Sequence, residues 1–174
     1  MKDKINYEYN YFLEPEEPIV SIDTLKKGSI IETKAMRTLR SAYCNIFFIG
    51  QNSGYNNNHE LIQQIMAMIK YTKSKRYIII SHHKKSRTNN TISKMKAMED
   101  SLSSQFGKHY INLRVYMKDS ALAKLGKKAT SEDIDSIKKG VVPPQLLIDR
   151  THFTDEAYSL IATLVKNKMM QLGY

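Results

Sequence analysis

The chain has 174 residues, 41% of them hydrophobic and 25% charged, which suits one globular domain with a sizeable core. No apolar run approaches the roughly 20 residues needed to cross a membrane, and the first residues lack the apolar stretch of a signal peptide. A soluble chain without a membrane partner is therefore expected. The single cysteine, Cys44, excludes an internal disulfide, and the sequence predicts neither a metal site nor a cofactor.

The formal net charge of +10 would allow binding to nucleic acid or another polyanion. The lysines, however, are scattered along the chain, and no aromatic residues interleave with them as they would in a surface that stacks bases. A nucleic-acid partner is therefore not expected, and a basic polyanion-binding domain is the weakest of the functional interpretations.

Residues 1–41 are expected to form an arm or linker ahead of a domain at residues 42–174. Prolines at positions 15 and 18 oppose both a helix and a central strand. Short extended segments are predicted at residues 19–22 and 29–33.

From residue 42 onward, apolar runs alternate with segments of helical periodicity. The runs at residues 45–49, 76–81 and 110–113 are typical of strands buried on both faces. Apolar residues at helical spacing predict helices at residues 58–72 and about 92–106. Strands that alternate with helices indicate an α/β fold with a three-layer, doubly wound parallel sheet of the flavodoxin-like kind.

The remainder is expected to be mostly helical. A helix is predicted at residues 115–125, and Thr130 with Asp133 resembles a capping box for a short helix that ends at Gly140. A long final helix is predicted to start near Thr154. Its apolar face consists of Leu160, Ile161, Leu164, Val165, Met169 and Leu172.

Two short motifs stand where such sheets bind ligands, beyond the carboxyl ends of the strands. Gly50 and Asn52 follow the first apolar run, and Asp149 and His152 lie between the apolar residues 146–148 and the final helix. A carboxylate three positions from an imidazole can fix its tautomer and leave the other ring nitrogen free to take a proton. The alternative interpretation is a solvated loop that starts a helix, with Asn52 as a turn residue capped by its own side chain.

The adjacent His82 and His83 raise the question of a metal pair. Neighbouring residues on an extended segment point to opposite faces, so the two rings cannot easily share one ion. They are expected to be loop residues near the cleft. His59 and His109 are expected at the surface or at helix ends.

The motifs Gly50-Gln51-Asn52 and Asp149-x-x-His152, in this order, resemble those of the SGNH hydrolase superfamily, also called GDSL-type esterases. The resemblance runs from about residue 43 to the C-terminus. It implies that Asn52 donates to an oxyanion hole and that Asp149 and His152 are the acid and base of a serine triad. The segments 110–116, 129–133 and 142–146 are similar to a subgroup met in bacteriophage tail and receptor-binding proteins.

The catalytic serine of that family lies in a Gly-Asp-Ser-like turn upstream of the asparagine, and no such turn is found. Ser21, Ser29 and Ser41 lack the flanking glycine and acid, and Gly28 is the only glycine before Gly50. The nucleophile is therefore unknown. In the phage-like subgroup an inserted domain can separate the nucleophile strand from the rest. Residues 1–41 would then be the end of that insertion, and the first strand of the sheet would be missing.

Two functions follow from the resemblance. The first is a serine esterase that acts on an acylated carbohydrate or a small ester, with the nucleophile supplied from outside the recognised region. The alternative is a non-catalytic structural or glycan-binding module of a phage tail or another surface assembly. The resemblance suggests association with a virion and leaves a homo-oligomer open.

Overall fold

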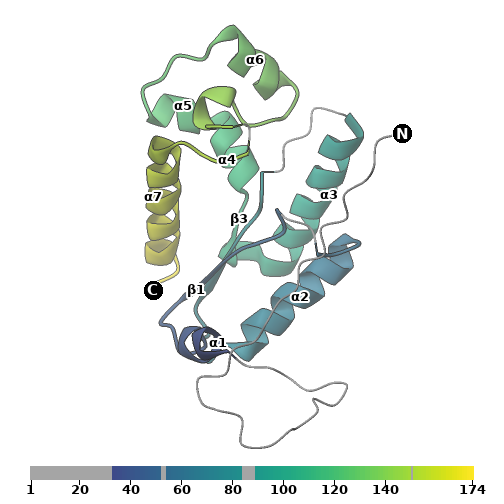
Figure 1. Cartoon of the computed structure of the whole chain (residues 1–174), viewed down its shortest axis with the longest axis vertical. Helices are drawn as coiled ribbons and strands as arrows, with labels where there is room; N and C mark the ends of the chain where they lie inside the picture. The colour runs from purple at the N-terminus through teal and green to yellow at the C-terminus, as the bar shows by residue number, and fades with distance from the viewer. Residues whose placement is uncertain (1–32, 52–53, 84–88, 150) are drawn as a thin grey trace, which may run out of the picture. The chain divides into compact units, whose positions relative to one another are not determined.

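The structure, a computed structural model, describes residues 33–51, 54–83, 89–149 and 151–174 (Figure 1). These residues belong to one compact unit that runs from Thr33 to Tyr174. The extended segment expected at 19–22, and all but Thr33 of that expected at 29–33, lie outside the described residues. None of the described helices is long and apolar enough to span a lipid bilayer.

The sheet has three parallel strands, as predicted from the three apolar runs. They are β1 (Asn45–Phe48), β2 (Tyr77–Ile80) and β3 (Tyr110–Ile111), hydrogen-bonded in the order β1-β2-β3. In the register of the first pair, Ile46 lies opposite Ile78. Each strand is one or two residues shorter than its apolar run.

Helices fill most of the remaining described chain. Their bounds are α1 (Lys34–Leu39), α2 (Asn58–Tyr71), α3 (Asn89–Phe106), α4 (Leu113–Asp119), α5 (Ala121–Lys124), α6 (Ser131–Lys138) and α7 (Asp155–Gln171), with the 3-10 turns η1 (Gly107–His109) and η2 (Pro144–Leu146). Helices α2, α3, α6 and α7 confirm the predictions.

Two features of the helices differ from expectation. Helix α1 was not predicted, because six residues are too few to show a periodic pattern. The single helix expected at 115–125 is split into α4 and α5 at Ser120, whose backbone, at φ −129°, leaves the helical region.

Side-chain caps start α2 and α6. The Asn57 side chain accepts the backbone N–H of Glu60 at 2.9 Å at the start of α2. Thr130 and Asp133 form the predicted capping box of α6. Each cap satisfies backbone N–H groups that have no partner inside the helix.

Strand β2 lies between two separate apolar cores. Ile78 and Ile80 face a core to which α4, α5 and α7 contribute, whereas Ile79 faces a core with α2 and α3. Because alternate residues of a strand point to opposite faces, helices cover both sides of the sheet (Figure 1). The described unit is therefore a three-layer α/β structure with an open parallel sheet.

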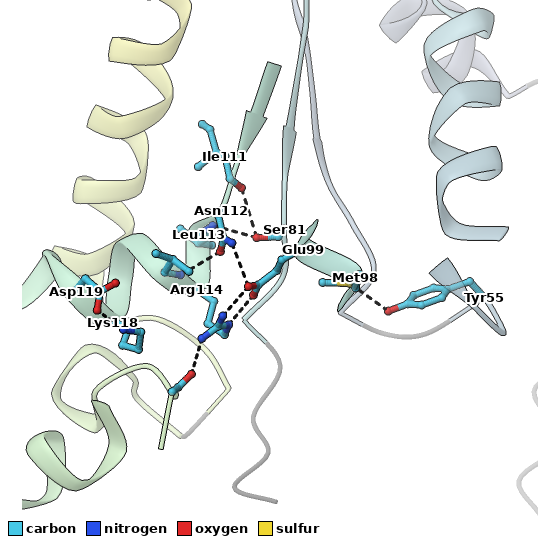
Figure 2. A network of polar contacts seen from close by, with 12 residues as sticks. Tyr55, Ser81, Met98, Glu99, Ile111, Asn112, Leu113, Arg114, Lys118 and Asp119 are labelled. Atoms are coloured by element: carbon cyan, nitrogen blue, oxygen red, sulfur yellow. Dashed lines mark hydrogen bonds and ion pairs between the residues drawn. The ribbon is translucent and has the colours of Figure 1, made fainter. Parts of the chain in front are cut away.

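A buried ion pair joins α3 to α4 (Figure 2). The Arg114 guanidinium donates to both carboxylate oxygens of Glu99, at 2.5 and 2.6 Å, and to the Gly140 carbonyl at 2.6 Å. The Asn112 amide donates to the same carboxylate at 3.1 Å. The two charged side chains are 4% and 3% exposed, so each depends on the other for compensation.

Replacing Arg114 with Met should therefore destabilise the fold strongly, because the Glu99 carboxylate would stay buried without its partner. The expected loss is about 3–5 kcal/mol of unfolding free energy, measured by urea denaturation. The matched control is Lys139→Met, which breaks an exposed pair with Asp135 and should cost less than about 1 kcal/mol. Equal losses in the two variants would contradict a structural role for the buried pair.

Candidate active site

The carboxyl ends of β1 and β2 lead into neighbouring loops. Gly50 lies two residues beyond β1, and Ser81, His82 and His83 directly follow β2. Ser81 is buried, and its hydroxyl accepts the backbone N–H of Leu113 at 3.0 Å, which fixes the end of β2 against the start of α4 (Figure 2).

Gly50 closely approaches the His82 ring. Its φ is +98°, and a Cβ at this position would lie 3.0 Å from His82 Cδ2. The Tyr55 hydroxyl lies 3.2 Å from His82 Nε2 and 3.5 Å from the Gly50 carbonyl oxygen. Burial raises the pKa of Tyr55, so its hydroxyl stays protonated near neutral pH. Tyr55 and His82 thus pack together beside Gly50, the first residue of the predicted oxyanion motif.

Asp149 and His152 form the predicted pair. His152 Nδ1 lies 2.7 Å from Asp149 Oδ2, while Asp149 Oδ1 accepts the backbone N–H groups of His152 and Thr151 at 2.8 and 3.0 Å. The backbone bond from His152, then the bond from its ring, and then that from Thr151 hold the pKa of Asp149 well below its usual range. The carboxylate is therefore ionised and only accepts hydrogen bonds.

This arrangement fixes the tautomer of His152. Because Asp149 only accepts, the single proton of the neutral ring lies on Nδ1, and the lone pair of that tautomer is on Nε2. Within the described part of the chain nothing is bonded to Nε2, and the His152 side chain is 67% exposed. An oriented imidazole with an open Nε2 is what a general base requires.

The turn that carries the pair is closed by backbone hydrogen bonds on both sides. The Ile148 N–H donates to the His152 carbonyl at 2.8 Å, and the Thr154 N–H donates to the Leu146 carbonyl at 3.0 Å. Leu147 and Phe153 pair as an isolated antiparallel bridge. The apolar residues 146–148 thus form a short bridge rather than a strand of the sheet.

His83 connects this turn to the loop after β2. Its Nε2 lies 2.8 Å from the Thr151 carbonyl oxygen, and its ring packs against Phe153 with centroids 4.1 Å apart. Burial lowers the pKa of His83, the bond to the Thr151 carbonyl partly opposes this, and the nearby His152 lowers it further. The contacts of His82 and His83 bring the loop after β1, the loop after β2 and the Asp–His turn to one edge of the sheet.

The two adjacent histidines are more buried than expected of loop residues. His82 is 2% and His83 6% exposed, because Tyr55 covers one ring and Phe153 the other. The rings point to different neighbours, as their adjacent positions predict. Among the described residues no three metal-binding side chains gather.

His59 and His109 lie at the surface or at a helix end, as expected. His59 lies in the first turn of α2 and is exposed. His109 ends η1, where it stacks on Tyr77 with centroids 4.4 Å apart and hydrogen-bonds the Tyr77 carbonyl.

The oxyanion donor and the nucleophile remain predictions. Asn52 lies outside the described residues, as do Ser21 and Ser29. Ser41 is described, and its hydroxyl donates to the Thr38 carbonyl at 3.1 Å. Within the described residues no serine hydroxyl is bonded to His152.

Comparisons of the chain with protein-family models, with curated proteins and with solved structures gave no match.

Gly50→Ala should be more destabilising than Gly54→Ala. Both glycines have a positive φ, +98° and +93°, so alanine strains the backbone at either position by about 1–2 kcal/mol. Only at Gly50 does the added Cβ meet another side chain, that of His82, and overpacking typically adds about 1–3 kcal/mol. Thermal unfolding of the two variants measures the difference. Equal destabilisation would argue against close packing of His82 on Gly50.

The lowered pKa of His83 predicts acid sensitivity. The unfolded chain binds a proton at this residue near the ordinary value of 6.5, whereas the folded chain binds it only at lower pH. The contribution of neutral His83 to the free energy of unfolding is therefore fully present above about pH 6.5 and declines as the pH falls below that value. Unfolding free energies measured between pH 7.5 and about 5 should fall more steeply for the wild type than for His83→Gln. If the unfolding free energies of the two proteins fall equally with pH, the lowered pKa of His83 is contradicted.

Proposed function

We propose that this chain supplies the acid, the base and the oxyanion loop of a serine esterase of the SGNH hydrolase kind, with the nucleophile on a segment outside the described residues. The observation that carries the proposal is the 2.7 Å bond between His152 Nδ1 and ionised Asp149, on a histidine side chain that is 67% exposed. The proposed substrate is an acylated carbohydrate or a small ester, on the strength of the motif resemblance.

In the proposed reaction, the serine oxygen attacks the ester carbonyl carbon while its proton passes to His152 Nε2. Asp149 keeps the ring oriented and stabilises the imidazolium. Asn52 donates to the oxyanion of the tetrahedral intermediate, a contact whose loss typically lowers the rate about 10²–10³-fold. When the alkoxy bond breaks, His152 returns the proton to the leaving alcohol. Water then hydrolyses the acyl-serine by the same route.

The exposed edge of the sheet at β1 supports the proposal that a further segment packs beside this strand. Strand β1 pairs only with β2 among the described strands. Ile46 and Phe48 are 48% and 42% exposed, although their register partners Ile78 and Ile80 are buried in the core with α7. Further segments beside β1 would cover these side chains. We assign this place to the polypeptide that carries the serine.

Polar atoms at both ends of β1 fit the same interpretation. Within the described part of the chain, Asn45 Nδ2 and Gln51 Oε1 are buried without a hydrogen-bond partner. Buried polar groups are normally paired, and a segment packed beside β1 could supply their partners.

A specific observation favours a second candidate, a non-catalytic glycan-binding module of a virion or surface assembly. A cavity of about 610 Å³ lies beside His82. Its lining combines apolar surface with amide and cationic groups, including Tyr55, Asn57, Asn58, Lys94, Met95 and Met98. Such a mixture suits a sugar, which has an apolar face and many hydroxyl groups.

Labelling with a fluorophosphonate separates the two candidates. The chain alone should not be labelled and should turn over an aryl acetate only weakly, because a site without one triad member keeps about 10³–10⁴ of acceleration over water. A longer polypeptide that contains the upstream serine should be labelled. His152→Ala should abolish that labelling, whereas the control His109→Ala, at a histidine bonded to the Tyr77 carbonyl at the start of β2, should not change it.

Stoichiometric labelling of this chain at Ser21, Ser29 or Ser41 would overturn the assignment of the nucleophile to another segment. A longer form that folds, resists labelling and hydrolyses no ester would favour the binding module.

A further inference from the structure

His83 is buried at the junction of β2 and the Asp–His turn, yet the proposed reaction does not use it. Its ring is held between the end of β2 and the face of Phe153, and only 6% of the residue is exposed. A buried imidazole loses its hydrogen bonds to water, so the bond that it makes to the protein shows which part of the structure the ring holds in place. That bond runs from Nε2 to the Thr151 carbonyl at 2.8 Å.

Thr151 is the residue next to the general base. Asp149 binds the N–H groups of Thr151 and His152 from inside the turn, but these bonds cannot fix where the turn lies relative to the sheet. The contact from His83 spans 68 residues of sequence and reaches the turn from β2. It therefore ties the position of the Asp149–His152 pair to the central strand of the sheet.

The chemistry of the bond determines the tautomer of His83. A carbonyl oxygen only accepts, so Nε2 must carry the proton. Nδ1 then holds a lone pair, and within the described residues this atom is buried without a partner. A second proton on Nδ1 would place a buried charge near His152, which is unfavourable. His83 can therefore hold the turn as a neutral donor while His152 gains and loses its proton.

We propose that His83 is a positioning residue, whose Nε2–H holds the Thr151 carbonyl and thereby sets where His152 presents its Nε2 at the edge of the sheet. The assignment rests on the proposed function of His152 as the general base. His83 itself does not touch the substrate. It acts through the backbone of the turn.

The test compares two substitutions at His83 that differ in the donor. His83→Phe keeps a flat ring against Phe153 but cannot donate, whereas His83→Gln keeps an N–H donor at about the reach of Nε2. Proton–nitrogen NMR of the histidine rings, with amide hydrogen exchange at Thr151 and His152, reports the state of the turn in the chain as it exists. Neither readout depends on hydrolysis.

His83→Phe should weaken or remove the hydrogen-bonded Nδ1–H signal of His152 and speed amide exchange at both positions at least tenfold. His83→Gln should restore both. The matched control is His109→Phe, which removes another histidine–carbonyl bond, to Tyr77, from a ring that also stacks on an aromatic neighbour. It should leave the His152 signals unchanged.

Unchanged signals and exchange in His83→Phe would overturn the proposal, as would equal losses in His83→Phe and His83→Gln. If His83→Phe does not fold, the protonation of the two ring nitrogens of wild-type His83, measured by NMR, tests the proposal instead. A proton on Nε2 and none on Nδ1 at neutral pH supports the assignment, and the reverse tautomer overturns it.

Activity separates this proposal from the function on which it rests. In a longer form that hydrolyses an ester, His83→Phe should lower kcat about 10–100-fold, the usual effect of losing a supporting contact, with little change in KM and with rescue by glutamine. If no form hydrolyses an ester, the proposed function fails, while the NMR comparison still shows whether His83 positions the turn.

Discussion

Burial of β2 on both faces is the constraint on which the rest of the unit depends. Ile78 and Ile80 are enclosed by the core with α4 and α7, and Ile79 is enclosed by the core with α2 and α3. A strand covered on both sides has little freedom to shift, so the residues that follow it are held in place. Those residues are Ser81, which fixes α4, and the two histidines, which contact Gly50 and the Asp–His turn.

Most of the regular structure could be predicted because it depends on local patterns. The three strands follow from continuous apolar runs, and α2, α3 and α7 follow from apolar residues at helical spacing. The split at Ser120 could not be predicted in this way, since the apolar pattern continues across it. The Asp149–His152 bond was predictable for a similar reason, because three residues of spacing in a turn suffice to bring the two side chains together.

The residues that surround Asp149 and His152 could not be predicted from the sequence. His82 and His83 look like solvated loop residues, and their burial depends on Tyr55, 27 residues before His82, and on Phe153, which is distant in sequence. The same holds for the pairing of Glu99 with Arg114, which lie on separate helices. Such polar contacts carry no periodic signal, although each of them fixes how two elements pack. The exposure of Ile46 and Phe48 on β1 was likewise not predictable from the apolar run, which is typical of a strand buried on both faces.

We propose that the loop after β1 and the Asp–His turn face one cleft at the carboxyl edge of the sheet. A crystal structure of the chain that locates the Asn52 side chain tests this most directly. We expect the Asn52 amide and His152 Nε2 to face each other across a gap that one acyl group fills. Side chains that lie on opposite faces of the sheet would contradict the hydrolase site and leave only an α/β fold with an isolated Asp–His turn.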